Sequence, residues 1–198
     1  MKKTQSGKVN YVSLNSLALY NADVSVFYEH ITKNKLFGVG VMGAYNFNLN
    51  TTLPNLFLYA LQNSKKNYDI GATFNFYPGE LNEGTSIYIG AMIKYTNFSF
   101  DKIISDSVTN SNVTSVSIRY SKTTGGQFAP FITGGTHTFL NDHFYLRTLI
   151  GIGVFKLNGD FKKEFNSRIN KNSKSNTPPS NYNFLPKMYL GINLGFNF

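Results

Sequence analysis

The sequence predicts an all-β fold: an antiparallel, up-and-down transmembrane β-barrel of about eight strands, closed by its own C-terminal strand. Three observations lead to this prediction. Apolar residues alternate with small or polar ones over most of the chain, which is typical of strands with two different faces. Charged residues make up only 15% of the chain, against about a quarter in an ordinary soluble domain. No apolar run approaches the roughly 18 residues that indicate a membrane-spanning helix.

The composition fits a single domain that covers residues 1–198. Aromatic residues reach 16%, carried by 18 Phe and 13 Tyr without any Trp. The mean hydropathy is only −0.21, because barrel strands alternate their apolar residues with polar ones. The absence of Cys excludes disulfides, thiolate catalysis and Cys-based zinc sites. The net charge of +9 does not decide between nucleic acid and anionic lipopolysaccharide as a neighbour.

The clearest alternation runs through residues 36–49, where Phe37, Val39 and Val41 alternate with Gly38 and Gly40. One face of this segment is bulky and apolar, and the other is small or polar. Five further segments repeat that asymmetry, and two weaker ones complete the set. The predicted strands are residues 8–14, 18–29, 36–49, 68–77, 86–98, 127–139, 143–155 and 187–198. An even number places both termini at the same end of the barrel, and neither a helix nor a second domain is predicted.

The predicted connections also alternate between short and long. Short turns are expected at residues 30–35, 78–85 and 140–142, and long loops at 50–67, 101–126 and 159–183. The first connection, at 14–17, is a short exception on the long side. Alternation at 115–122 is compatible with an extension of the sixth strand beyond the membrane. Short turns at one end and long loops at the other are typical of outer-membrane barrels.

A soluble sandwich or lipocalin-like barrel is the alternative, because its strands alternate as well. In that case the polar faces would meet water and would carry many charges. Here they carry Gly, Asn, Thr, Tyr and isolated ions, which suits a narrow enclosed lumen. The opposite faces carry no charge at their middle positions, as a lipid-facing surface requires. The membrane barrel is therefore the preferred interpretation.

The C-terminal strand resembles the terminal assembly signal of bacterial outer-membrane proteins. It alternates apolar residues and ends on an aromatic residue, through Tyr189, Leu190, Ile192, Leu194, Phe196 and Phe198. Residues 25–30 and 36–41 likewise resemble the Glu-containing first hairpin of small eight-stranded barrels of the OmpA, OmpX and OmpW kind, a porin-like superfamily. The resemblance implies a Gram-negative outer membrane, lipopolysaccharide as neighbour and recognition by the barrel assembly machinery. Met1-Lys2-Lys3 begins like an export signal, but polar residues follow, so that signal is expected to be absent from this sequence.

Six ionisable residues fall on the faces predicted to line the lumen. Counted from the turns, Glu29 and Arg147 share one end of the barrel and are expected to pair across the interior. A buried charge is tolerated when a partner and hydrogen bonds satisfy it. The preferred interpretation is a structural ionic network, and the alternative is an ion pathway or gate. The network comprises Asp23, Glu29, Asp69, Lys94, Arg147 and Lys187.

Catalytic and metal chemistry find little support in the sequence. Lipid A deacylases with this fold place Ser two residues after His, whereas His137 is followed by Thr138 and Phe139. His30 and His143 flank turns and are expected at the surface. No catalytic residue and no cofactor is predicted. No metal site is predicted either, because the isolated loop acids lack the spacing of a calcium loop. Nucleic-acid binding would need basic and aromatic residues on one accessible face, so no nucleic acid is expected as a partner.

The last long loop gathers positive charge. Contact with lipopolysaccharide phosphates or with another outer-membrane protein is the hypothesis, and a solvated loop is the alternative. The sequence therefore predicts a non-enzymatic outer-membrane barrel with a structural, adhesive or partner-binding role through its extracellular loops. A narrow channel or small hydrophobic-ligand transporter is the second interpretation, and a lipid A-modifying acyl hydrolase the third. The basic residues of the loop are Lys162, Lys163, Arg168, Lys171 and Lys174.

Overall fold

The computed structural model describes residues 9–19, 23–47, 65–79, 81, 84–110, 113–172 and 181–198. At 65, 102–103, 105–110, 113–118, 168–169 and 171–172 it describes the backbone alone. No helix in the described part of the chain is long and apolar enough to cross a membrane.

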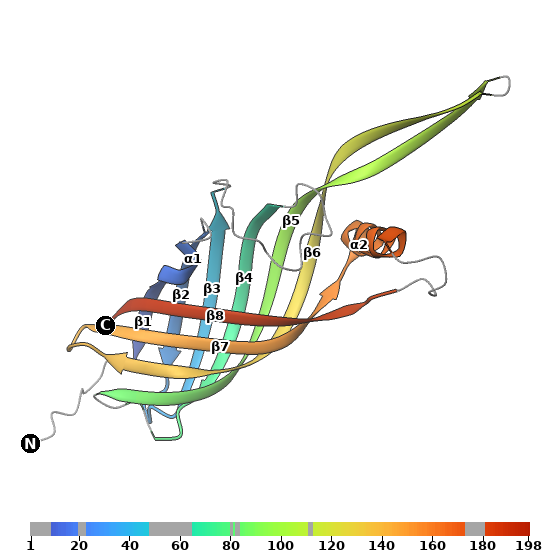
Figure 1. The fold of residues 1–198 in the computed structure, drawn as a ribbon. Coiled ribbons are helices and arrows are strands. Elements are labelled where there is room, and N and C mark those ends of the chain that lie inside the picture. Colours follow the sequence, from blue (N-terminus) through green and yellow to red (C-terminus); the bar gives the residue numbers. More distant parts are fainter. Residues whose placement is uncertain are drawn as a thin grey trace, which may run out of the picture.

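The described residues form one closed antiparallel barrel (Figure 1). Its order is β1-β2-β3-β4-β5-β6-β7-β8, and β1 closes the barrel by pairing antiparallel with β8. The predicted all-β, antiparallel up-and-down barrel and its eight strands are therefore confirmed. Two helices accompany the strands, α1 (Ser16–Leu19) and α2 (Gly159–Asn172). The strands are β1 (Asn10–Asn15), β2 (Asp23–Ile31), β3 (Phe37–Asn46), β4 (Lys65–Phe76), β5 (Thr85–Asn110), β6 (Val113–Phe139), β7 (Phe144–Leu157) and β8 (Phe184–Asn197).

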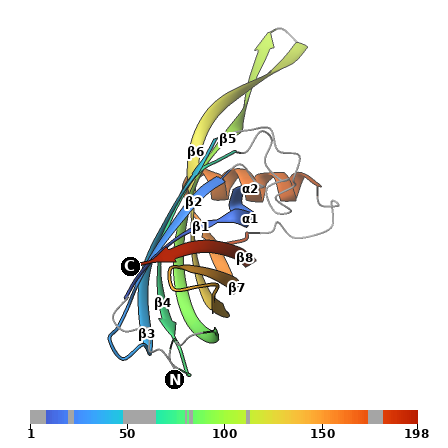
Figure 2. The same ribbon diagram turned by 90° about the vertical axis from the view of Figure 1, so that its left-hand side faces the viewer.

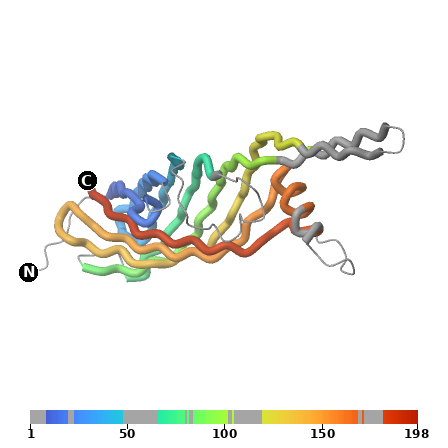
Figure 3. The backbone as a smooth tube through the Cα atoms, turned by 45° about the horizontal axis from the view of Figure 1, so that its top comes forward, coloured from blue at the N-terminus to red at the C-terminus, as the bar shows by residue number. Residues whose placement is uncertain are grey.

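The barrel has a short-turn end and a loop end. The short-turn end carries the β2–β3, β4–β5 and β6–β7 connections. The first and last strands also meet there, since Asn10 and Phe198 exchange two backbone hydrogen bonds of 3.3 and 3.0 Å. The loop end carries α1, the β5–β6 hairpin and α2 (Figure 2). From the short-turn end, β7 and β8 run side by side toward α2 (Figure 3).

The predicted long loop at 101–126 is wrong, because these residues continue β5 and β6. Their ladder runs without interruption to the pair Asn110↔Val113, so the extension expected at 115–122 is confirmed. Polar Ser and Thr alternate there with β-branched residues, and such residues favour strands over irregular loops. The many polar residues favour a loop in the sequence, but their alternation with apolar residues is compatible with the strands that are observed.

The prediction of no helix is also wrong. The segment expected as a polar loop at 159–183 begins with α2, which covers Gly159–Asn172. Phe161 and Phe165 are four residues apart and therefore share one face of the helix. Asp160 lies in the first turn, where a negative charge is favourable. At the other long loop, β4 begins at Lys65, and residues 50–64 lie outside the described residues.

The outward face of the barrel is apolar. Burial alternates along β2 and β3, so that Val39, Val41 and Tyr45 are each more than half exposed. The alternate residues Gly40, Met42 and Ala44 are buried. Other outward side chains around the barrel are also more than half exposed, namely those of Ile70, Ile89, Ile132, Ile150 and Leu190. Among the described strand residues of this belt, none at an outward position between the two ends is charged. Lys156 marks its limit at the loop end of β7.

Candidate functional site

The barrel interior holds two layers of the ionisable residues that were predicted to line the lumen. The layer near the short-turn end centres on Glu29. Its carboxylate accepts hydrogen bonds from Asn75 Nδ2 at 2.6 Å and from the Tyr77 hydroxyl at 3.1 Å. Arg147 Nη1 lies 3.0 Å from Glu29 Oε2, so the expected contact across the lumen is present. Both side chains are 1% exposed. The carboxylate is thus fully enclosed, and its hydrogen-bond partners come from β4, from the turn that follows β4 and from β7.

Arg147 fills the middle of this layer. Its guanidinium lies 4.4 Å from the ring centroid of Phe27 and 4.4 Å from that of Tyr88. A cation held against two aromatic faces gains electrostatic stabilisation, particularly where water is excluded. Tyr88 and Tyr145 are as completely buried as Arg147. These side chains are packed together inside the barrel at this level.

His137 is a lumen residue that the sequence interpretation did not include. It stacks on Tyr145 with ring centroids 4.4 Å apart and meets Tyr11 edge to face at 5.2 Å. Neither ring nitrogen has a hydrogen-bond partner among the described residues. Gly135, His137 and Phe139 are spaced by two and therefore share one face of the strand. That spacing could have indicated a lumen position for His137, but the alternation along residues 127–139 is too weak to show which face points inward. His137 is held by ring contacts, and no hydroxyl among the described residues is hydrogen-bonded to either of its nitrogens.

The other two histidines lie at the surface near the short-turn end. His30 Nδ1 lies 3.0 Å from Asn10 Oδ1. His143 stacks on Phe196, with ring centroids 5.6 Å apart. Both are exposed, in line with the expectation for residues that flank turns.

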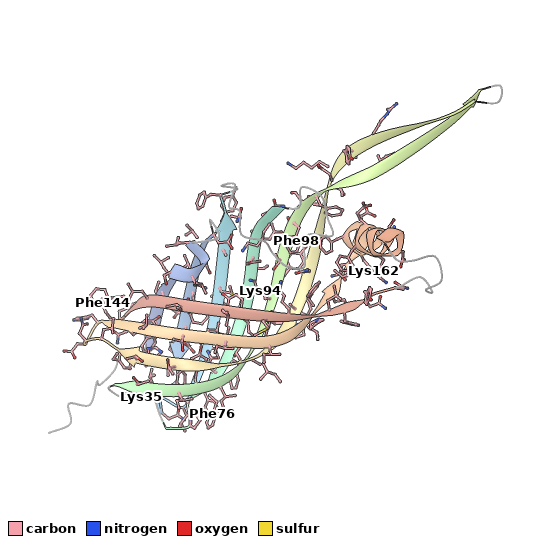
Figure 4. All side chains as sticks on the ribbon, viewed as in Figure 1. Lys35, Phe76, Lys94, Phe98, Phe144 and Lys162 are labelled. Carbon is pink, nitrogen blue, oxygen red and sulfur yellow. The ribbon has the colours of Figure 1, made fainter. Side chains whose placement is uncertain are left out.

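The layer nearer the loop end is an ionic cluster on β2, β4 and β5. Asp69 Oδ2 lies 2.8 Å from Lys94 Nζ and 3.0 Å from Lys66 Nζ. Lys66 also pairs with Asp23. Lys94 lies inside the barrel in Figure 4, with its ammonium 4.7 Å from the Tyr189 ring centroid. Lys66 was not among the predicted residues, because its position fell in an expected loop.

Lys187 completes the predicted set in a different way. Its Nζ donates to Gln127 Oε1 at 2.8 Å and lies 5.5 Å from the Phe155 ring centroid. No carboxylate of the described residues lies within ion-pair distance of it. Five of the six predicted lumen ions are thus in ion pairs, and the sixth is held by an amide.

Apolar side chains fill the lumen between and above these layers. Phe27, Met42, Met92 and Phe131 belong to one continuous buried cluster. A Cβ at Gly40 would lie 2.7 Å from Phe27 Cζ. Small residues on one strand therefore accommodate large side chains from another, as an eight-stranded interior requires.

Helix α2 extends the apolar cluster at the loop end. The Phe161 ring stacks on Phe98 with centroids 5.4 Å apart and meets Phe100 edge to face at 5.5 Å. A Cβ at Gly125 would lie 2.5 Å from Phe161 Cβ, so the helix approaches β6 where a glycine leaves room. Phe98 and Lys162 mark this junction in Figure 4. The segment expected as a free loop is docked on the β5–β6 ladder.

The structure describes the side chains of only some of the basic residues that were predicted to gather in this segment. Lys163 is exposed and lies 3.6 Å from Asp160, and Lys162 is half-buried. Arg168 and Lys171 are within α2, but their side chains, like the whole of Lys174, lie outside the described part of the structure. Across the described residues, no three His, Asp or Glu side chains are placed to hold a metal ion.

The C-terminal strand carries its predicted residues on two faces. Leu190, Ile192, Leu194 and Phe196 face outward and are 42–53% exposed, and Phe198 is 55% exposed. Tyr189 faces inward, where Asn15 Nδ2 donates to its hydroxyl at 3.2 Å. The regular alternation of β8 thus joins the outward belt to the lumen.

Comparison with known proteins found similarity in structure alone. No protein-family model matches the chain, and no curated protein sequence is significantly similar to it. Among solved structures, the chain is similar to the N-terminal β-barrel domain of Pseudomonas aeruginosa OprF. The identity is 9%, with 96% of this chain and 97% of that chain covered, at a TM-score of 0.43. It is also similar to Neisserial surface protein A (NspA), at 12% identity, with 96% and 93% covered and a TM-score of 0.38.

Proposed function

We propose that this chain is a non-enzymatic barrel of a bacterial outer membrane, closed to solute flow, with a structural, adhesive or partner-binding role at its loop end. One observation carries the proposal. The described strands present an apolar belt without charge on the outside of the barrel, while their ion pairs lie buried on the inside.

The outward belt favours lipid over water. Monomeric soluble proteins rarely expose continuous apolar surface beyond a few hundred Å², and here outward Val, Ile, Leu and Phe residues encircle the barrel. A strand of about 9–11 residues suffices to cross the hydrocarbon when tilted. Strands β2 and β3 have 9 and 10 residues. A Lys or Arg at mid-bilayer would cost about 2–4 kcal/mol, which explains why the belt carries none at its described middle positions.

The packed lumen argues against the channel interpretation. Arg147, Tyr88 and Tyr145 are buried in one layer, and Glu29 holds the guanidinium in place. An ion or solute would have to displace this layer, leaving a buried charge without its partner at a cost of several kcal/mol. The same packing leaves no hydrophobic-ligand path through this layer. A structural ionic network is the better interpretation of these residues.

The loop end is the part available for recognition. It presents the β5–β6 hairpin and the basic helix α2 (Figure 1). Anionic lipopolysaccharide, or another outer-membrane protein, is the proposed neighbour. Binding to lipopolysaccharide should weaken with salt because exposed charges are screened. It should be lost when Lys162, Lys163, Arg168, Lys171 and Lys174 are all neutralised, and binding unchanged by that variant would remove lipopolysaccharide as a partner of α2.

The C-terminal strand is the proposed recognition element for the barrel assembly machinery. Its outward residues from Leu190 to Phe198 alternate with small or polar inward ones. Because β8 also closes the barrel against β1, recognition of this strand would precede closure. This role concerns biogenesis and is independent of what the loop end binds.

The experiment that tests the membrane proposal is refolding of the purified protein with and without detergent or lipid. We expect folding only in detergent or lipid, with a gel mobility that changes on heating. A folded monomer in plain buffer would overturn the proposal. Lipid A from cells with and without the protein should have identical acyl composition by mass spectrometry, and loss of an acyl chain would revive the hydrolase alternative.

A further inference from the structure

The β5–β6 hairpin extends past the strands that flank it. Lys65, the first described residue of β4, pairs with Ser99 of β5. Strand β7 ends at Leu157, which pairs with Gln127 of β6. The β5–β6 ladder nevertheless continues to Asn110↔Val113, beyond the barrel (Figures 1 and 2). Within the described residues, no strand pairs with the outer edge of β5 from Lys102 to Asn110.

An unpaired strand edge is a template for another strand, and proteins usually protect such edges with charge or Pro. The two edges of this hairpin differ in that respect. Between Val113 and Gly126, strand β6 contains Arg119 and Lys122 and no carboxylate. Antiparallel pairing of β6 with its own copy would bring only like charges together, which is unfavourable. The edge of β5 contains both signs.

The order of residues along β5 is self-complementary. Lys102, Ile104 and Asp106 are spaced by two and therefore belong to the same face of the strand. In an antiparallel pair of two β5 strands with a two-fold axis at Ile104, each Lys102 stands opposite Asp106 of the second copy. Ile104 stands opposite itself. Sliding one strand by two residues would place Asp106 opposite Ile104, so this register is favoured over its neighbours.

We propose that β5 of two molecules pairs edge to edge in this register, and that the two molecules lie in opposing membranes. The inference rests on the proposed membrane location. Strand β5 runs from the short-turn end toward the loop end, so copies in one membrane present it in the same direction. Antiparallel pairing therefore requires the copies to face each other. The contact is two-fold symmetric and joins one molecule to one other, which suits adhesion between cells.

The test uses two populations of lipid vesicles with different fluorescent dyes, both carrying the full chain. Energy transfer between vesicles should show tethering by the natural protein. Lys102→Asp or Asp106→Lys on both populations should abolish tethering, because like charges then stand opposite each other. One variant on each population should restore it, since every pair is again complementary. Lys33→Asp, in the exposed β2–β3 turn at the other end of the barrel, changes the net charge as Lys102→Asp does and should tether normally.

Cross-linking tests the register. The chain has no Cys, so Ile104→Cys introduces a single thiol that should join two molecules across tethered vesicles on oxidation. Val108→Cys stands away from the two-fold axis and should not. Failure to insert in vesicles would contradict the membrane proposal itself. Inserted protein that does not tether, or charge variants that are not restored by mixing, would overturn this inference and leave the membrane proposal intact.

Discussion

Glu29 on β2 and Arg147 on β7 meet inside the barrel, with Oε2 and Nη1 3.0 Å apart and both side chains sealed from solvent. Strands β1 and β8 separate β2 from β7 in the sheet, so this contact spans the lumen and links the two sides of the closure. The pair should therefore stabilise the closed barrel, because it joins strands that do not neighbour each other in the sheet.

Glu29→Ala should lower the free energy of unfolding by about 3–5 kcal/mol, because it leaves the Arg147 guanidinium buried without a countercharge. The double variant Glu29→Leu with Arg147→Met should lose much less than the sum of the single variants. Urea unfolding of the detergent-folded protein measures both. Lys163→Ala, which removes an exposed ion pair, is the control and should have no measurable effect. Additive losses in the double variant would show that the pair is not coupled.

Gly40→Ala should destabilise the barrel by about 1–3 kcal/mol through overpacking. The new methyl group would lie 2.7 Å from both Phe27 Cζ and Thr73 Oγ1, and 2.8 Å from the Tyr28 carbonyl oxygen. The matched control is Gly43→Ala on the same strand. Gly43 faces outward and a Cβ there meets nothing within 4 Å. Equal unfolding midpoints for the two variants would contradict the packing that is described for the lumen.

Phe161→Ala should release α2 without unfolding the barrel. The ring is 1% exposed and packs on Phe98 and Phe100, and loss of a buried Phe typically costs about 3–5 kcal/mol. A short polar helix cannot compensate for that loss by itself. Hydrogen exchange and limited proteolysis should therefore accelerate at residues 159–172 while the heat-dependent gel mobility stays unchanged. Lys163→Ala is the exposed control, and unchanged exchange in Phe161→Ala would show that α2 is held by other contacts.

The natural protein should give near-zero conductance in planar bilayers, because a layer of buried side chains closes its lumen. Tyr88→Ala combined with Tyr145→Ala removes two completely buried rings from that layer and should produce measurable current. Tyr45→Ala, which removes an outward ring that is 58% exposed, should remain silent. Stable conductance of the natural protein would support the channel alternative instead.

Phe198→Ala should reduce the amount of assembled protein in cells while leaving refolding in detergent unchanged. The side chain is 55% exposed, so little packing is lost, whereas recognition of the C-terminal strand should depend on it. Phe144→Ala, another outward aromatic near the same end, is the matched control for general loss of lipid contact. Equal assembly of Phe198→Ala and the natural protein would remove Phe198 from the proposed assembly signal.

The sequence by itself determined the barrel, because period-two alternation assigns the residues of most of its strands to one of two faces. Residues 36–49 show this most clearly: their predicted outward and inward sets are those observed along β3. The same reasoning placed Glu29 and Arg147 on the inner faces and near the same end. Alternation is a local property, so it can be recognised without knowledge of any contact.

Tertiary structure alone decided what the lumen side chains and the loop-end segments do. Phe161 and Phe165 gain their role only from the apolar surface and the glycine at position 125 that lie opposite them. His137 was undecided because its strand alternates poorly, and its place followed from the rings of Tyr11 and Tyr145. These outcomes depend on partners far apart in the chain, whose distances a local pattern does not contain.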